Sequence, residues 1–279
     1  MKILIQFPEG LKKFALEKAE ELENEGNEVI LFCEPCYGAC DLRDREAKLL
    51  GCQKILHLGH KDFGLESEVP VEYLEVKEKK DPKEIISILE KNFEKFGDAK
   101  VIAIASNIQF EYCLKDVQTF LESKGIKVKN LGAILGCFEF KEKEEHALFI
   151  GDGRFHALAL NAEKIFFLDI EKNCLEDISD IARRWEMKRL ARIEKFKEAK
   201  KIGILVSLKK GQYYKDFFKL KEMIEKLGKK AKVLVMDEIK EEKLMGFDFD
   251  CYLNTACPRI ADHFSLPLVN LRDIERLLS

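Results

Sequence analysis

The segment 254–261 combines residue types that can bind a metal or a small molecule. Within it, Cys257 is followed by Pro258 and Arg259. Proline stiffens the backbone, and a guanidinium binds a carboxylate through two parallel hydrogen bonds. Because the segment follows the apolar run 247–253, we expect it to leave the C-terminal end of a buried strand, where open α/β sheets place ligands. The segment therefore indicates a metal-ligand or substrate loop, and the alternative is a small buried thiol in a turn.

Nine cysteines are an odd number in a chain with no secretion signal. This argues against a disulfide framework and for thiols that bind metal, react or pack. Four of the cysteines stand where a small hydrophobic side chain would serve, and we expect them to fill the core. They are Cys52, Cys113, Cys174 and Cys251.

Cys33, Cys36 and Cys40 form a Cys-x2-Cys-x3-Cys run in one predicted loop. Three thiolates in one loop can hold three irons of a 4Fe-4S cluster and leave the fourth iron open to a substrate. The spacing is the reverse of the one that radical S-adenosylmethionine enzymes generally carry, and Pro35 stiffens the loop. A zinc site in the same loop would need a fourth ligand, and the neighbouring sequence shows no obvious one.

A second arrangement takes one cysteine from each of three distant segments: Cys40, Cys137 and Cys257. Each thiol is expected on a loop after a strand, and three strand ends that face one another would enclose a pocket. A glycine or a proline stands close to each thiol, which allows the backbone to approach a bulky cluster. Three protein ligands would again leave one metal position open.

Strands and helices alternate in three successive stretches, which predicts α/β units, each a small parallel sheet with flanking helices. Each unit is small for an independent domain, so we expect the three to pack on one another as pseudo-repeats around a central cluster site. Their openings are alike, a lysine followed by apolar residues, at 2–5, 100–103 and 201–204. The expected units are 1–97 with Cys40, 98–199 with Cys137 and 200–279 with Cys257.

The elements of these units follow from the spacing of apolar residues and from the glycines and prolines between them. We expect strands at 2–7, 28–32, 54–58, 100–105, 127–135, 148–150, 164–169, 201–206, 232–236 and 249–253. We expect helices at 11–25, 42–50, 82–96, 110–124, 179–200, 213–227 and 271–278.

Charge and hydropathy exclude two classes of partner. The formal net charge of −3 excludes strong whole-molecule attraction to nucleic acid. No stretch approaches the roughly 18 uncharged apolar residues of a membrane span. The first residues already read as a strand, without the apolar region of a signal peptide, so we expect a cytoplasmic protein.

Several motifs occur together along nearly the whole chain. Those around the cysteines are Tyr-Gly-Ala-Cys-Asp at 37–41, Leu-Gly-Cys at 135–137 and Thr-Ala-Cys-Pro-Arg-Ile-Ala at 255–261. The others are Gln-Phe-Pro-Glu-Gly-Leu at 6–11, His-Leu-Gly-His at 57–60, Gly-Asp-Gly-Arg-Phe-His at 151–156 and Gly-Gln at 211–212. In this order the set resembles the archaeal diphthamide synthases, the 2-(3-amino-3-carboxypropyl)histidine synthase family.

The resemblance implies a homodimer in which Cys40, Cys137 and Cys257 bind one 4Fe-4S cluster. The open iron would engage S-adenosylmethionine, and one electron from an electron donor would cleave the sulfonium bond to the methionine γ-carbon. The resulting 3-amino-3-carboxypropyl radical would add to C2 of a histidine imidazole on translation elongation factor 2, leaving methylthioadenosine. The product is the first intermediate of diphthamide. Cys36 is not one of the family's ligands, and we expect a spare thiol.

Contacts to S-adenosylmethionine can be expected from the chemistry of residues in these motifs. A bidentate fork from Arg259 can bind the methionine carboxylate. The backbone at 151–153 can approach the nucleoside, with Asp152 on a ribose hydroxyl, and the alternative is a tight turn. His57, His60 and His156 are polar contacts, proton carriers or hydrogen-bonded structural residues. The expected substrate-binding residues are Gly151, Asp152, Gly153, Arg154, His156 and Arg259.

Three other functions remain open. A quinolinate synthase-like enzyme also has three similar units with one cluster cysteine each, but it needs a phosphate site and no S-adenosylmethionine. A non-catalytic electron-transfer subunit would need no substrate pocket. A zinc-stabilised binding module would be colourless, whereas an iron-sulfur protein is brown.

Overall fold

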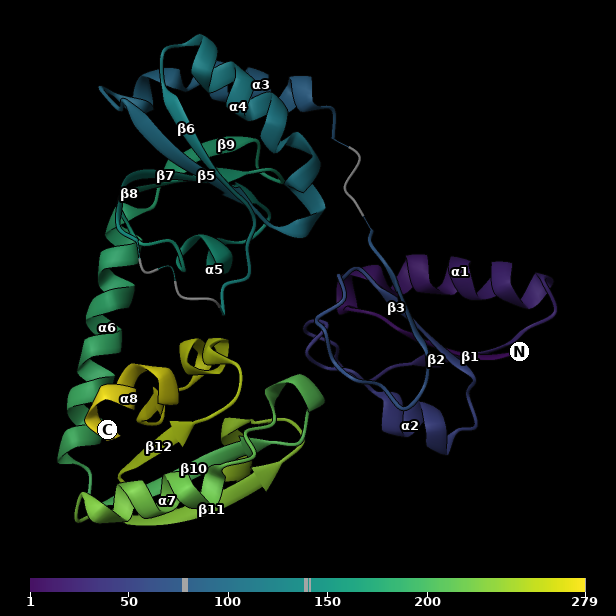
Figure 1. Ribbon diagram of the computed structural model, residues 1–279, viewed down its shortest axis with the longest axis vertical. Coiled ribbons are helices and arrows are strands. Elements are labelled where there is room, and N and C mark those ends of the chain that lie inside the picture. The colour runs from purple at the N-terminus through teal and green to yellow at the C-terminus, as the bar shows by residue number, and fades with distance from the viewer. Residues whose placement is uncertain (77–79, 138–139, 141, 279) are drawn as a thin grey trace. The chain divides into compact units, whose positions relative to one another are not determined.

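The computed structural model describes residues 1–76, 80–137, 140 and 142–278, and it contains three sheets flanked by helices (Figure 1). Strand pairing is parallel in all three sheets except at one edge, which confirms the predicted α/β class. Residues 1–76 and 192–279 together form one compact unit, and residues 77–191 form a second. The three predicted domains, 1–97, 98–199 and 200–279, stay a prediction.

The first sheet has the strand order β2-β1-β3-β4, with α1 and α2 on opposite faces (Figure 1). Successive side chains of a strand point to opposite faces. Accordingly Ile3 and Ile5 of β1 pack with Ala15 of α1, whereas Leu4 packs with Ala47 of α2. The elements are β1 (Lys2–Gln6), η1 (Glu9–Leu11), α1 (Lys12–Asn24), β2 (Glu28–Phe32), α2 (Asp44–Leu49), β3 (Lys54–Leu58) and β4 (Val71–Leu74).

The second sheet has the order β6-β5-β7-β8-β9, and β9 runs antiparallel to β8. Ile102 and Ile104 of β5 face α3 and α4, and Ala103 and Ala105 face the side of α5 (Figure 1). The elements are α3 (Pro82–Lys91), η2 (Phe93–Phe96), β5 (Val101–Ser106), η3 (Ile108–Cys113), α4 (Leu114–Ser123), β6 (Lys127–Ala133), β7 (Glu144–Gly151), α5 (Arg154–Ala157), β8 (Ala162–Asp169) and β9 (Cys174–Asp177).

The third sheet has the order β11-β10-β12-β13 and is parallel throughout. Ile202 and Ile204 of β10 pack with Phe196 of α6, Leu220 of α7 and Ile274 of α8 on one face. The elements are α6 (Ser179–Glu198), β10 (Lys201–Ser207), η4 (Lys210–Gln212), α7 (Phe217–Lys226), β11 (Lys230–Met236), η5 (Glu241–Leu244), β12 (Cys251–Asn254), η6 (Pro258–His263), β13 (Leu268–Asn270) and α8 (Leu271–Leu278).

The three sheets share one order, in which the first strand of each sheet lies between the second and the third. The second strand is added on one side of the first strand and the third strand on the other side, so the direction of strand order reverses there. The C-terminal ends of the strands at such a reversal are where α/β sheets bind ligands. Cys40 and Cys137 follow the second strand of their sheets, and Cys257 follows the third. All three predicted ligands therefore come after the C-terminal ends of parallel strands.

Three of the four cysteines expected in the core are buried in hydrophobic clusters, namely Cys52, Cys113 and Cys251. Cys174 opens the edge strand β9 and is only partly buried. Within the described ranges, every helix is too short or too polar to cross a bilayer.

Candidate functional site

The loop that carries Cys40 is fixed to the segment that follows β10. The backbone N–H of Gly211 donates to the carbonyl oxygen of Cys40 at 2.8 Å, and Gln212 Nε2 lies 3.4 Å from Cys40 Sγ. A Cβ at position 211 would lie 2.7 Å from the Cα of Cys40, so the two backbones approach this closely only with glycine. The Gly-Gln pair at 211–212 therefore holds the loop that carries the Cys40 thiol.

Buried ion pairs also hold the Cys40 loop. The Asp41 carboxylate has no exposed surface, and the ammonium of Lys209 donates to it. Arg43 forms a bidentate pair with Asp237, with both N···O distances at 3.0 Å, and its backbone N–H donates to Gln6 Oε1. Burial raises the pKa of Asp41, while Lys209 and Arg43 act in the opposite direction. These contacts hold the Cys40 loop at several points.

The Cys257 loop is held by a pair of buried asparagines. Asn254 Nδ2 donates to the carbonyl oxygen of Cys257 at 2.9 Å and to Asn270 Oδ1 at 2.8 Å. Its Oδ1 accepts from the backbone N–H of Ala256 at 3.1 Å. Pro258 then begins η6, where its fixed φ suits the first helical position. The loop geometry is thus set by the ends of β12 and β13.

Cys40 and Cys257 come to the same edge of the third sheet. Strands β10 and β12 pair in parallel, with Leu205 beside Asn254. The segment bonded to the Cys40 loop follows β10, and Cys257 follows β12. Both predicted ligands therefore lie at the C-terminal edge of this sheet, within one compact unit.

Cys137 lies in the other compact unit, on the exposed turn after β6. The backbone N–H of the preceding Gly136 donates to His156 Nδ1 at 2.8 Å. This bond joins the Cys137 turn to the predicted substrate segment 151–156, which ends β7 and begins α5. Because Nδ1 of His156 accepts a hydrogen bond, the ring proton of neutral His156 is on Nε2.

Other residues of the segment 151–156 have protein partners. Asp152 Oδ1 accepts a hydrogen bond from Asn107 Nδ2 at 2.6 Å, which fixes its carboxylate. The guanidinium of Arg154 pairs with Glu176 on β9. Gly153 lies directly before α5. The structure leaves the substrate contacts of these residues as predictions.

Arg259 is exposed on η6, two residues after Cys257, which is the residue before that helix. The sequence interpretation missed the residues that hold these loops, above all Lys209, Asp41 and Asn254. Lys209 and Asn254 had a signal, because each is a polar residue at or just after the end of an apolar run, whereas Asp41 comes late in the loop that follows β2. What the sequence lacked was the identity of the distant partner.

The cysteines that the sequence grouped locally behave differently from one another. Cys33 is exposed and its thiol donates to the carbonyl oxygen of Leu31 at 3.7 Å. Cys36 is buried, with its Sγ 3.8 Å from His57 Nε2. Cys40 Sγ instead contacts Gln212. The structure therefore gives each thiol of this run its own surroundings.

The donor set fits an iron-sulfur cluster. Hydrogen bonds hold the backbone next to each predicted ligand, Cys40, Cys137 and Cys257. Such support orients a metal ligand. Thiolates are the ligands that such clusters prefer. Burial raises the pKa of the Cys40 thiol, and coordination to iron would take the place of its proton.

Comparison with known proteins gives consistent results. The family model described as a putative diphthamide synthesis protein matches residues 7–279. The 2-(3-amino-3-carboxypropyl)histidine synthase of Pyrococcus horikoshii is 35% identical, over 99% of this chain and 85% of that protein. The synthase of the same name from Methanocaldococcus jannaschii is 30% identical, over 93% of this chain and 78% of that protein.

A solved structure matches equally well. The crystal structure of Dph2 from Pyrococcus horikoshii with a 4Fe-4S cluster has a TM-score of 0.87 to this chain. The two are 35% identical, and the match covers 99% of this chain and 86% of that one.

Proposed function

This chain belongs to the family of diphthamide synthesis proteins, and we propose that it modifies a histidine of translation elongation factor 2. Its activity is that of a 2-(3-amino-3-carboxypropyl)histidine synthase, as in its two archaeal relatives. The donor of the 3-amino-3-carboxypropyl group is S-adenosylmethionine. The reaction breaks the bond between the sulfonium sulfur and the methionine γ-carbon, joins that carbon to C2 of the imidazole and releases one proton. The electron used for cleavage would be given back when the radical adduct loses this proton, so the overall reaction consumes no electron.

The observation that carries the proposal is the support of the Cys40 loop by Gly211 and Gln212, at the sheet edge where Cys257 also lies. Cys40, Cys137 and Cys257 would hold the 4Fe-4S cluster. When bound and reduced, the cluster supplies the single electron that cleaves S-adenosylmethionine to a carbon radical. The structure of the relative with a 4Fe-4S cluster supports the presence of such a cluster.

The protein's own residues would bind and orient the substrate. The guanidinium of Arg259, next to the Cys257 loop, forks onto the methionine carboxylate. The carboxylate of Asp152 accepts a hydrogen bond from a ribose hydroxyl, and Asn107 keeps it in place. The nucleoside would also be contacted by the neighbours of Asp152, namely Gly151, Gly153, Arg154 and His156. Neutral His156 would donate a hydrogen bond through Nε2.

The protein partners follow from the reaction. A homodimer is proposed on the family resemblance. A separate electron donor would reduce the cluster, because amino-acid side chains do not supply electrons at low potential. The site of action is the cytoplasm, where the elongation factor works.

The test is an anaerobic assay with wild-type protein and two variants, Cys257→Ala and Cys33→Ala. Cys33 is the matched control, because it is an exposed thiol of the Cys40 loop whose thiol donates to Leu31. The proteins are reconstituted with iron and sulfide, reduced with dithionite and given S-adenosylmethionine and archaeal elongation factor 2. Small molecules and the factor are then analysed by mass spectrometry.

Wild-type protein and Cys33→Ala should give methylthioadenosine and a factor heavier by one aminocarboxypropyl group. Cys257→Ala should give neither. A bound cluster without cleavage of S-adenosylmethionine would reject the proposal, and would favour a quinolinate synthase-like enzyme or an electron-transfer subunit.

A further inference from the structure

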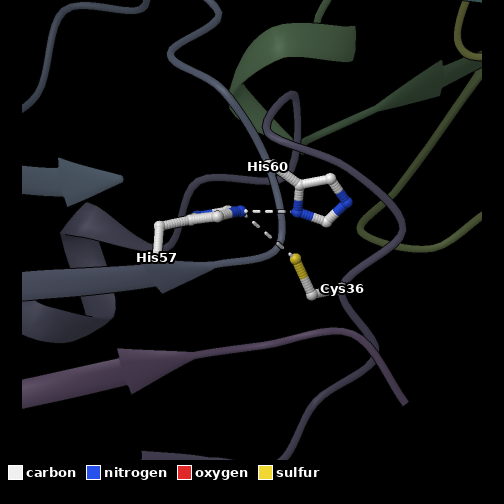
Figure 2. A group of neighbouring side chains, drawn as sticks. All are labelled: Cys36, His57 and His60. Carbon is white, nitrogen blue, oxygen red and sulfur yellow. Dashed lines mark hydrogen bonds between the residues drawn. The ribbon is translucent and has the colours of Figure 1, made fainter. Parts of the chain in front are cut away.

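Cys36, His57 and His60 form a cluster that the reaction above does not use. His57 is on β3, His60 lies two residues after that strand, and Cys36 comes from the loop after β2. Figure 2 shows the three side chains pointing toward one another. His57 Nε2 lies 3.8 Å from Cys36 Sγ and 3.0 Å from His60 Nδ1, and the three atoms all lie within 4.8 Å of one another.

These separations resemble the edges of a metal tetrahedron. With Zn–S of about 2.3 Å and Zn–N of about 2.0–2.1 Å, a tetrahedral ion places its S and N ligands about 3.6 Å apart and its two N ligands about 3.3 Å apart. The observed S···N and N···N distances of 3.8 and 3.0 Å differ from these values by small fractions of an ångström. The third edge lies within 4.8 Å, so the Cys36 and His60 side chains would have to rotate to bring it to about 3.6 Å.

The backbone prepares the site before any ion binds. His57 is held in the middle of the sheet, between Gln6 on β1 and Tyr73 on β4. Gly59 then takes a φ of +79°, and its N–H donates to Leu74 at 2.8 Å. This left-handed turn returns the chain, so that the His60 ring packs edge-on to the His57 ring with centroids 5.2 Å apart.

Burial keeps all three groups uncharged in the absence of a metal. Cys36 is 3% exposed, His57 has no exposed surface and His60 is partly buried. Burial raises the pKa of Cys36 to about 12 and lowers the pKa of His57 to about 3 and that of His60 to about 4. Neutral imidazoles are the form that binds metal, and a divalent ion displaces the thiol proton. His57 Nδ1 is a buried nitrogen for which the described residues offer no hydrogen-bond partner.

We propose that Cys36, His57 and His60 bind one Zn²⁺ ion, separate from the iron-sulfur ligands and with its fourth position open to water or an external ligand. One thiolate with two imidazoles is a donor set that zinc favours over calcium or magnesium, which prefer oxygen. Because Cys36 is four residues before Cys40, the ion ties the Cys40 loop to the end of β3. Cys36, which the sequence analysis expected to be a spare thiol, would then be a zinc ligand. This proposal does not depend on the catalysed reaction.

Zinc and iron are to be measured together by mass spectrometry in anaerobically purified full-length protein that carries its cluster, after exposure to Zn²⁺ and desalting. Wild-type protein should keep one zinc per chain. Cys36→Ser, His57→Gln and His60→Gln should each lower the retained zinc by at least about tenfold and leave the cluster iron bound. Cys33→Ser, an exposed thiol of the same loop, is the matched control and should keep its zinc.

Zinc K-edge X-ray absorption of the wild-type protein needs no variant and covers the case in which a variant fails to fold. The proposal predicts one sulfur neighbour at about 2.3 Å and two or three nitrogen or oxygen neighbours at about 2.0 Å. Two or more sulfur neighbours would place the zinc on other cysteines and overturn the proposal. Wild-type protein that keeps no more zinc than Cys36→Ser, or variants that all keep as much as wild type, would overturn it too.

Discussion

Removal of the Lys209 ammonium should destabilise the protein strongly, because it leaves the Asp41 carboxylate buried without its main partner. The side chains are 4% and 0% exposed, so water cannot replace the lost contact. Breaking a buried pair from one side costs about 3–5 kcal/mol. Arg43 Nε lies 2.9 Å from Asp41 Oδ1 and is a second cation beside the carboxylate, so we expect the lower end to apply. We therefore expect Lys209→Met to lower the free energy of unfolding by about 3 kcal/mol, or roughly 150-fold in the folding equilibrium.

The measurement is urea unfolding at neutral pH, followed by circular dichroism. Lys197→Met is the matched control, because Lys197 pairs with Glu194 at the surface, where the side chains are 46% and 65% exposed. Such a pair contributes about 0–1 kcal/mol. Lys209→Met/Asp41→Asn removes the buried carboxylate together with its partner, so this double variant should recover part of the loss. Equal stability of Lys209→Met and Lys197→Met would refute the reasoning, as would a double variant no more stable than Lys209→Met.

The effect of Lys209→Met should also depend on pH in a defined direction. Burial already raises the pKa of Asp41 above its ordinary value of 3.8, and loss of Lys209 raises it further. A carboxyl with a raised pKa in the folded state loses stability as pH rises from its unfolded value through the folded one. The difference between variant and wild type should therefore shrink as the pH is lowered from 7 toward 4. A difference that grows in acid would contradict this account.

The other predictions concern the loops of the predicted cluster ligands. Gly211→Ala places a Cβ 2.7 Å from the Cα of Cys40 and should reduce retained iron without unfolding the protein, whereas Gly10→Ala, with open space around it, should keep wild-type iron. Asn254→Ala leaves Asn270 Oδ1 and the carbonyl oxygen of Cys257 without their donor and the N–H of Ala256 without its acceptor, and should cost about 2–4 kcal/mol in urea unfolding together with loss of iron. Arg43→Lys loses the bidentate fork onto Asp237 and should cost about 1–2 kcal/mol by the same assay; an unchanged midpoint would show that the fork contributes nothing.

The fold class was predictable because buried parallel strands are apolar runs, such as 100–105, separated by helices with one apolar face. Three short strands were missed, of which one is the three-residue strand Leu268–Asn270. Val71–Leu74 has a single exposed residue and no clear alternation, and Cys174–Asp177 is an antiparallel edge strand at the end of a parallel sheet. Strands of three or four residues carry too few side chains for the period of two to stand out.

The candidate site was predictable only as a set of loops. Each thiol follows an apolar run, and that pattern placed Cys40, Cys137 and Cys257 at strand ends. The contacts that fix the loops join distant positions, as in Lys209 and Asp41, which are 168 residues apart. Such pairs depend on how strands are ordered in space, and single-sequence periodicity holds no such information. The meeting of Cys36 with His57 and His60 was missed for the same reason.

The most direct test of the central claim follows the carbon atoms of the substrate. S-adenosylmethionine labelled with ¹³C in the four-carbon methionine chain, but not in the methyl group or the adenosine, is given to the reduced protein and elongation factor 2. The account predicts label in one histidine of the factor and unlabelled methylthioadenosine in equal amount. Deoxyadenosine with labelled methionine would show cleavage of a different carbon–sulfur bond, and would contradict the proposed aminocarboxypropyl transfer.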